Sequence, residues 1–185
     1  MIAVVDENVA IVANDATRIN SGLPPIAEQA GNECRLAAVR YLRSLITSGE
    51  VVVDDAGACF GKYARHLSRR GQPGIGDAFL RHILENAHNS DRVERVTLAV
   101  EDDEFVAFPK HEALQTFDED DRIWIALALA SDRDPEVANA VDSDYRQHRQ
   151  ALLDAGVKVV EVCAGTTATN GIRQPGRVRR TRQRS

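Results

Sequence analysis

Apolar residues along the chain switch repeatedly between a strand-like and a helix-like spacing. Short apolar runs, such as IAVV at residues 2–5, are typical of buried strands. Between residues 34 and 46, apolar residues recur on one face of a helix, which predicts an amphipathic helix ended by Ser48 and Gly49. The pattern predicts strands at 2–5, 50–53, 93–100, 137–141 and 157–162, and helices at 34–46, 57–70, 78–87, 123–130 and 145–153.

Short strands that alternate with helices indicate an α/β protein with a mainly parallel sheet covered on both faces. At 185 residues with 43% hydrophobic residues, the chain is long enough for one ordinary domain with a real core. We expect this domain at residues 1–164, followed by a basic C-terminal arm at residues 165–185.

The net charge of −5 conceals an uneven distribution of charge. Residues 165–185 contain six arginines and no acid, which leaves 17 basic and 28 acidic residues in the body. The arm has few apolar residues and no periodicity, so we expect it to be mobile. Two interpretations remain open for it: an electrostatic tether for nucleic acid, or a solubilising end. In the first, phosphates are contacted by Arg177, Arg179, Arg180, Arg182 and Arg184.

The three cysteines, Cys34, Cys59 and Cys163, show neither paired nor metal-type spacing, which argues against a disulfide framework and a zinc site. A reducing compartment fits this pattern best. The sequence begins without a basic leader, and no segment approaches the roughly 20 apolar residues that a membrane span requires. We therefore expect a soluble, cytoplasmic protein with no membrane attachment.

Acidic residues follow or precede the predicted elements at one edge of the expected sheet. Asp6 follows the first strand, an acidic run at 118–121 precedes the apolar helix, and Asp142 and Asp144 follow the strand at 137–141. In open α/β folds the chemistry usually lies at the carboxyl ends of the strands, where these acids are placed. Converging carboxylates repel one another unless a hard cation such as Mg²⁺ or Mn²⁺ lies between them.

Each of these acids also has a structural interpretation. Aspartate is a preferred N-cap, and acids in the first turn of a helix complement its dipole. Asp142 and Asp144 fit a turn followed by a cap. The ordered occurrence of acids in three segments favours a metal site more than any single residue does.

Four ordered motifs resemble the PIN-domain nuclease family. They are VVDENV at 4–9, FDEDDRIWIALALA at 117–130, NAVDSDY at 139–145 and LLDAGVKVVEV at 152–162. The resemblance covers about residues 1–163. It implies a three-layer α/β/α sandwich that holds acidic residues around Mg²⁺ or Mn²⁺ and hydrolyses phosphodiester bonds, usually of single-stranded RNA.

The resemblance also implies roles for individual residues. The metal ligands would be Asp6, Asp121 and Asp142, with Asp120 or Asp118 as substitutes for Asp121. Asp144 is a common auxiliary acid and joins these three in the predicted catalytic set. Asn8 is the supporting neighbour of Asp6.

Lys62 stands where the family usually places a glutamate, on the helix after the second strand, in the segment ACFGKYARHL. Three interpretations remain open. The lysine pairs with the aspartates and leaves them without metal, or it contacts a phosphate, or it is a solvated helix residue in a misaligned match.

Two hypotheses follow. The first is a Mg²⁺- or Mn²⁺-dependent endoribonuclease, of the toxin-like or the RNA-processing kind. The second is a catalytically silent PIN-like module that binds RNA or a protein partner, with Lys62 in place of the acidic ligand. The partners compatible with them are RNA, a protein antitoxin or regulator, and a second copy of the chain in a homodimer.

Overall fold

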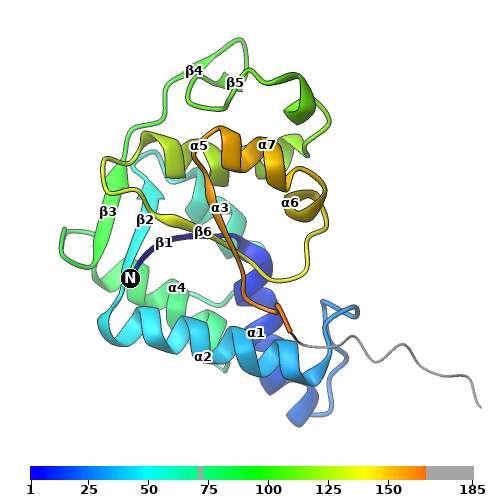
Figure 1. Ribbon diagram of the computed structural model, residues 1–185. Helices are drawn as coiled ribbons and strands as arrows, with labels where there is room; N and C mark the ends of the chain where they lie inside the picture. The colour runs from blue at the N-terminus through cyan, green and yellow to red at the C-terminus, as the bar shows by residue number, and fades with distance from the viewer. Residues whose placement is uncertain (71–72, 166–185) are drawn as a thin grey trace, which may run out of the picture.

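A five-stranded parallel sheet forms the centre of the fold (Figure 1). The computed structural model describes residues 1–70 and 73–165. The strands are β1 (Ile2–Val5), β2 (Glu50–Asp54), β3 (Val93–Val96), β6 (Glu136–Asn139) and β7 (Lys158–Glu161). They lie in the order β3-β2-β1-β6-β7, so the N-terminal strand is central. Each predicted strand contributes to this sheet, and the side chains of β1, β2 and β6 are largely buried because both faces of the sheet are covered.

Helices cover the two faces of the sheet, which makes a three-layer α/β/α arrangement (Figure 1). One layer contains α1 (Glu7–Asn20), α2 (Asn32–Ser48) and α4 (Ile75–Glu85). The opposite layer contains α5 (Arg122–Ala130) against the central strands and α7 (Arg149–Asp154) against β7. Two shorter helices, α3 (Ala58–Ala64) and α6 (Asp144–Gln147), lie near the carboxyl ends of β2 and β6. The predicted mainly parallel α/β fold is therefore confirmed.

Several elements differ from the sequence prediction. The helix α1 was not predicted at all, although Val9, Val12 and Ala13 have helical spacing and are fully buried. The predicted strand at 93–100 ends at Val96, and the chain continues into a two-stranded hairpin of β4 (Val100–Glu101) and β5 (Glu104–Phe105). The predicted helix at 145–153 is divided into α6 and α7 at His148.

The chain reverses its direction of sheet building at β1. It first adds β2 and β3 on one side of β1, and then returns to add β6 and β7 on the other side. In such sheets a crevice forms outside the carboxyl ends of the two strands at the reversal, because the following helices lie on opposite faces. The carboxyl ends of β1 and β6 are therefore the position where a site is expected.

The predicted absence of paired cysteines is wrong. Cys34 in the first turn of α2 forms a disulfide with Cys163, just after β7, and their Cα atoms are 4.7 Å apart. The two residues are separated by 129 positions, so local spacing carried no information about the pair. Cys59 is a free, buried thiol. The argument for a reducing compartment loses its basis, and the cytoplasmic location stays a prediction.

Among the described residues, no helix combines the length and the apolar character needed to cross a bilayer. The arginines expected to contact nucleic acid all lie in residues 166–185, outside the part of the chain that the structure describes.

Candidate acidic metal site

Asp6 occupies the peptide position where β1 ends and α1 begins. Its carboxylate accepts a hydrogen bond from the backbone N–H of Asn8 at 2.9 Å, so it caps α1. Its other oxygen accepts a hydrogen bond from the Tyr145 hydroxyl at 2.7 Å. Only 1% of Asp6 is exposed, and this burial, together with the nearby Glu7 and Asp121, raises its pKa well above the usual range.

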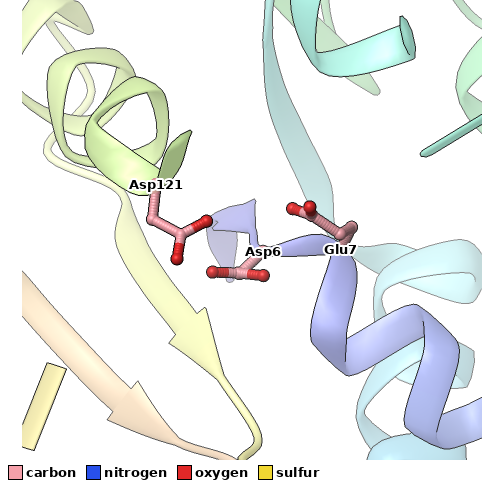
Figure 2. A group of neighbouring side chains, drawn as sticks. All are labelled: Asp6, Glu7 and Asp121. Atoms are coloured by element: carbon pink, nitrogen blue, oxygen red, sulfur yellow. The ribbon is translucent and has the colours of Figure 1, made fainter. Parts of the chain in front are cut away.

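Glu7 and Asp121 complete an acidic cluster around Asp6 (Figure 2). One carboxylate oxygen from each of the three residues lies within 4.8 Å of the other two. Asp6 and Glu7 come from the start of α1, whereas Asp121 ends the 3₁₀ turn Glu119–Asp121 and directly precedes α5. The structure thus brings together two of the predicted ligands, Asp6 and Asp121, and adds Glu7.

Glu7 was not predicted as a site residue, because the sequence pattern did not predict the helix α1 that begins with it. The Oε2 atom of Glu7 is buried and has no hydrogen-bond partner among the described residues. A buried carboxylate oxygen without a donor is costly, so it indicates that the site suits a cation.

Asp121 has a strongly perturbed acidity. Its pKa is raised to about 8, and burial is the largest cause. A side-chain hydrogen bond with Asp142 and the negative charge of Glu7 raise it further, whereas the Lys62 ammonium lowers it. Asp6 and Asp121 in the metal-free cluster therefore bind protons more tightly than isolated carboxylates do.

Asp142 lies beside Asp121 but outside the cluster of three. The loop that carries it is fixed by Asn139, a fully buried residue at the end of β6. The Asn139 side chain accepts a hydrogen bond from the backbone N–H of Asp142 and donates one to its backbone carbonyl, at 3.1 and 2.9 Å. It also donates to both carboxylate oxygens of Glu161 in β7.

Asn8 supports this arrangement from the other side. Its Nδ2 donates to Asn139 Oδ1 at 3.1 Å, and its Oδ1 accepts from the backbone N–H of Ala140 at 2.9 Å. Asn8 therefore ties the first turn of α1 to the carboxyl end of β6. The role of Asn8 as a supporting neighbour of Asp6 stays a prediction; its backbone N–H donates to the Asp6 carboxylate. Nothing in the sequence indicated that the Asn139 side chain hydrogen-bonds to Asn8, Asp142 and Glu161.

Asp144, Asp118 and Asp120 have structural contacts instead. Asp144 Oδ2 accepts a hydrogen bond from the backbone N–H of Asp118, and Asp118 Oδ1 accepts one from the backbone N–H of Asp120. These residues shape the turn that delivers Asp121 to the cluster. Asp54, at the end of β2, accepts from the backbone N–H groups of Ala58 and Cys59 and thus caps α3.

Lys62 points its ammonium group into the same region. Its Nζ lies 3.9 Å from Glu7 Oε1, and only 11% of its side chain is exposed. The next residue, Tyr63, donates a hydrogen bond to the backbone carbonyl of Val5, which anchors α3 to the end of β1. The interpretation of Lys62 as a solvated helix residue is therefore wrong.

The donor set consists of carboxylate oxygens, which Mg²⁺ and Mn²⁺ prefer. Three acids in close contact carry an unfavourable repulsion that a divalent cation would remove.

Comparison with protein-family models, curated protein sequences and solved structures found no match to the chain.

A stability measurement across pH tests the electrostatics of the cluster. Asp121 and Asp6 bind protons more strongly in the folded than in the unfolded chain, so the metal-free protein should lose stability as pH rises from about 4 towards 8. Metal binding requires deprotonated acids, so added Mg²⁺ should raise the melting temperature more at pH 8.5 than at pH 6. A larger stabilisation by Mg²⁺ at pH 6 would contradict this arrangement.

Proposed function

We propose that the chain is a PIN-like, Mg²⁺- or Mn²⁺-dependent ribonuclease that hydrolyses phosphodiester bonds of single-stranded RNA. The observation that carries the proposal is the approach of the Asp6, Glu7 and Asp121 carboxylate oxygens at the carboxyl end of the central strand. The acid order along the chain and the three-layer fold support the family resemblance.

The residues of the cluster fit a hard divalent cation, which would be held by Asp6, Glu7 and Asp121, with Asp142 beside them. When bound, such an ion lowers the pKa of a coordinated water and stabilises charge on a phosphate. Tyr145 orients Asp6 through its hydroxyl, and Asn139 fixes the backbone around Asp142. Lys62 places a positive charge where it can face a phosphate oxygen.

Residues 1–164 carry a net negative charge, so the affinity for RNA must come from another part of the chain. The body carries 17 basic and 28 acidic residues, so it repels a polyanion on average. In this proposal the arm arginines, Arg177, Arg179, Arg180, Arg182 and Arg184, contact phosphates without base preference.

A cleavage assay tests the proposal. Full-length protein is incubated with a mixture of unstructured RNAs in Mn²⁺ and, in parallel, in EDTA. The expected result is RNA cleavage in Mn²⁺ that EDTA abolishes, together with saturable stabilisation of the protein by Mn²⁺. The absence of both RNA cleavage and protein stabilisation in Mn²⁺ would overturn the proposal.

A second candidate function is favoured by the Lys62–Glu7 contact. An ammonium 3.9 Å from Glu7 can neutralise part of the cluster and take the place of a cation. The protein would then be a catalytically silent PIN-like module that binds RNA or a protein. Binding of RNA in EDTA without any cleavage in Mn²⁺ would favour this alternative.

A further inference from the structure

A cavity of about 480 Å³ lies beneath the β4–β5 hairpin, beside the start of α5. In Figure 1 the hairpin stands on the outer side of the α5 and α7 layer, away from the sheet. Arg122, the first residue of α5, lines the cavity, and its neighbour Asp121 contributes to the acidic cluster. The segment at the start of α5 therefore contributes one residue to the cavity and the preceding residue to the acidic cluster. A volume of this size suits a small organic ligand.

The lining of the cavity combines two aromatic rings with hydrogen-bond donors and hydrogen-bond acceptors. Phe105 and Phe108 contribute partly exposed rings, and Glu101 and Glu104 contribute exposed carboxylates. Arg122 contributes a guanidinium whose side chain is only 14% exposed. Lys110 and His111 also line the cavity, which thus offers hydrogen-bond acceptors at the hairpin and donors from these residues and Arg122.

Arg122 is held in place but is not fully satisfied. Its Nη1 lies 3.3 Å from Glu104 Oε1, its Nη2 donates to the Gln115 carbonyl, and its Cζ lies 5.0 Å from the centre of the Phe108 ring. The Nε–H of Arg122 is buried and has no acceptor among the described residues. Because this Nε–H is not exposed to the cavity, Arg122 can donate to a ligand there only through the second N–H of Nη1 or Nη2, each of which uses its other N–H in the contacts above.

These features select among ligand classes. The lining places three acids, Glu101, Asp102 and Glu104, beside three basic side chains, Lys110, His111 and Arg122. This mixture favours a neutral polar ligand over a doubly charged phosphate, and so many polar groups disfavour a purely apolar ligand. A flat ring with amino donors and a ring-nitrogen or carbonyl acceptor matches the carboxylates, the guanidinium and the aromatic faces together. An unpaired nucleobase has this chemistry, and single-stranded RNA is recognised by stacking on aromatic or arginine planes.

We propose that the cavity beneath the β4–β5 hairpin binds one unpaired nucleobase with an exocyclic amino group, next to the acidic cluster. Glu104 accepts from the amino group, an Nη of Arg122 donates to a ring acceptor, and the Phe108 ring provides the stacking surface. Cytosine, adenine and guanine carry such an amino group, whereas uracil presents carbonyls in its place. The inference rests on the proposed function because it names the substrate feature that the same enzyme would read.

The test measures binding without cleavage. Full-length protein is titrated with labelled hexanucleotides C6, A6 and U6 in EDTA, at a salt concentration that weakens phosphate contacts. C6 and A6 are expected to bind about tenfold more tightly than U6, the range that one well-formed polar base contact provides.

Two variants assign the preference to the cavity. Phe108→Ala is expected to weaken C6 binding by about tenfold through lost stacking. Glu104→Ala, at a side chain that is 67% exposed, is expected to bring C6 and U6 to nearly equal affinity. Matched controls are Phe60→Ala, whose ring carries Arg69 at 4.6 Å but lies in α3, and Glu112→Ala, an exposed acid outside the lining.

The outcomes separate this inference from the proposed function. Equal binding of the three hexanucleotides, no binding at all, or equal effects of cavity and control variants would overturn the nucleobase site, even if Mn²⁺-dependent cleavage is found. A cavity-dependent preference in EDTA with no cleavage in Mn²⁺ would support the nucleobase site and contradict the nuclease.

Discussion

Replacement of Asp121 by asparagine is expected to lower Mn²⁺-dependent cleavage of RNA by at least about 100-fold. Loss even of groups that only support metal ligands costs about 10- to 100-fold, and Asp121 supplies an oxygen of the cluster itself. The same variant should melt at an equal or higher temperature than the parent in EDTA at pH 8. A neutral amide can still donate to Asp142, and it removes a carboxylate whose charged form is disfavoured by burial and by the charge of Glu7.

The matched control for this experiment is Asp120→Asn. Asp120 precedes Asp121 in the same 3₁₀ turn and is exposed, and it is not part of the cluster. It should keep cleavage within about twofold of the parent, as for surface changes away from special features. Equal losses in the two variants would show that the turn, and not the carboxylate of Asp121, supports the activity.

The centre of the sheet was predictable because its strands are buried on both faces. Runs such as VVVD in β2 and IAVV in β1 are apolar at consecutive positions, and this pattern is typical of central parallel strands. The helix α1 escaped prediction because its stripe is carried by small residues and is interrupted by the buried polar Asn14 and Asp15. Asp15 accepts hydrogen bonds from the backbone of Ile26 and Ala27, a tertiary role that local pattern does not show.

The candidate site was predictable only in part. Position after a strand placed Asp6 and Asp142 at the correct edge, and position before a helix did the same for Asp121. The distinction between a cluster member and a cap required three-dimensional contacts. Asp54 and Asp6 both follow strands, yet Asp54 only caps α3, whereas Asp6 caps α1 and also meets two other acids.

The features that the sequence did not predict, the disulfide and the contacts of Asn139, depend on residues distant in sequence. The pair of Cys34 and Cys163 forms because α2 begins near the end of β7. Asn139 gains its function from Asn8 and Glu161, at separations of 131 and 22 residues. Such partners leave no periodicity or spacing that a single sequence could reveal.

The residue that most clearly divides the two proposed functions is Lys62. Its ammonium lies 3.9 Å from Glu7 and opposes the rise in the pKa of Asp121, so it competes with a divalent ion for the same negative charge. Lys62→Glu replaces this cation with a carboxylate and changes the local charge by two units. The expected result is at least about tenfold tighter Mn²⁺ binding and higher RNA cleavage, or new cleavage if the parent has none.

The same substitution should lower the melting temperature in EDTA, because a fourth acid would then face Asp6, Glu7 and Asp121 without a counterion. Lys158→Glu is the matched control, since Lys158 also pairs with an acid, Asp134, but at a surface where both side chains are more than half exposed. It should leave Mn²⁺ affinity unchanged. If Lys62→Glu alters Mn²⁺ affinity, cleavage and metal-free melting no more than Lys158→Glu does, Lys62 does not act on the acidic cluster. If metal binding tightens but cleavage falls, the ammonium instead serves the reaction by facing the phosphate.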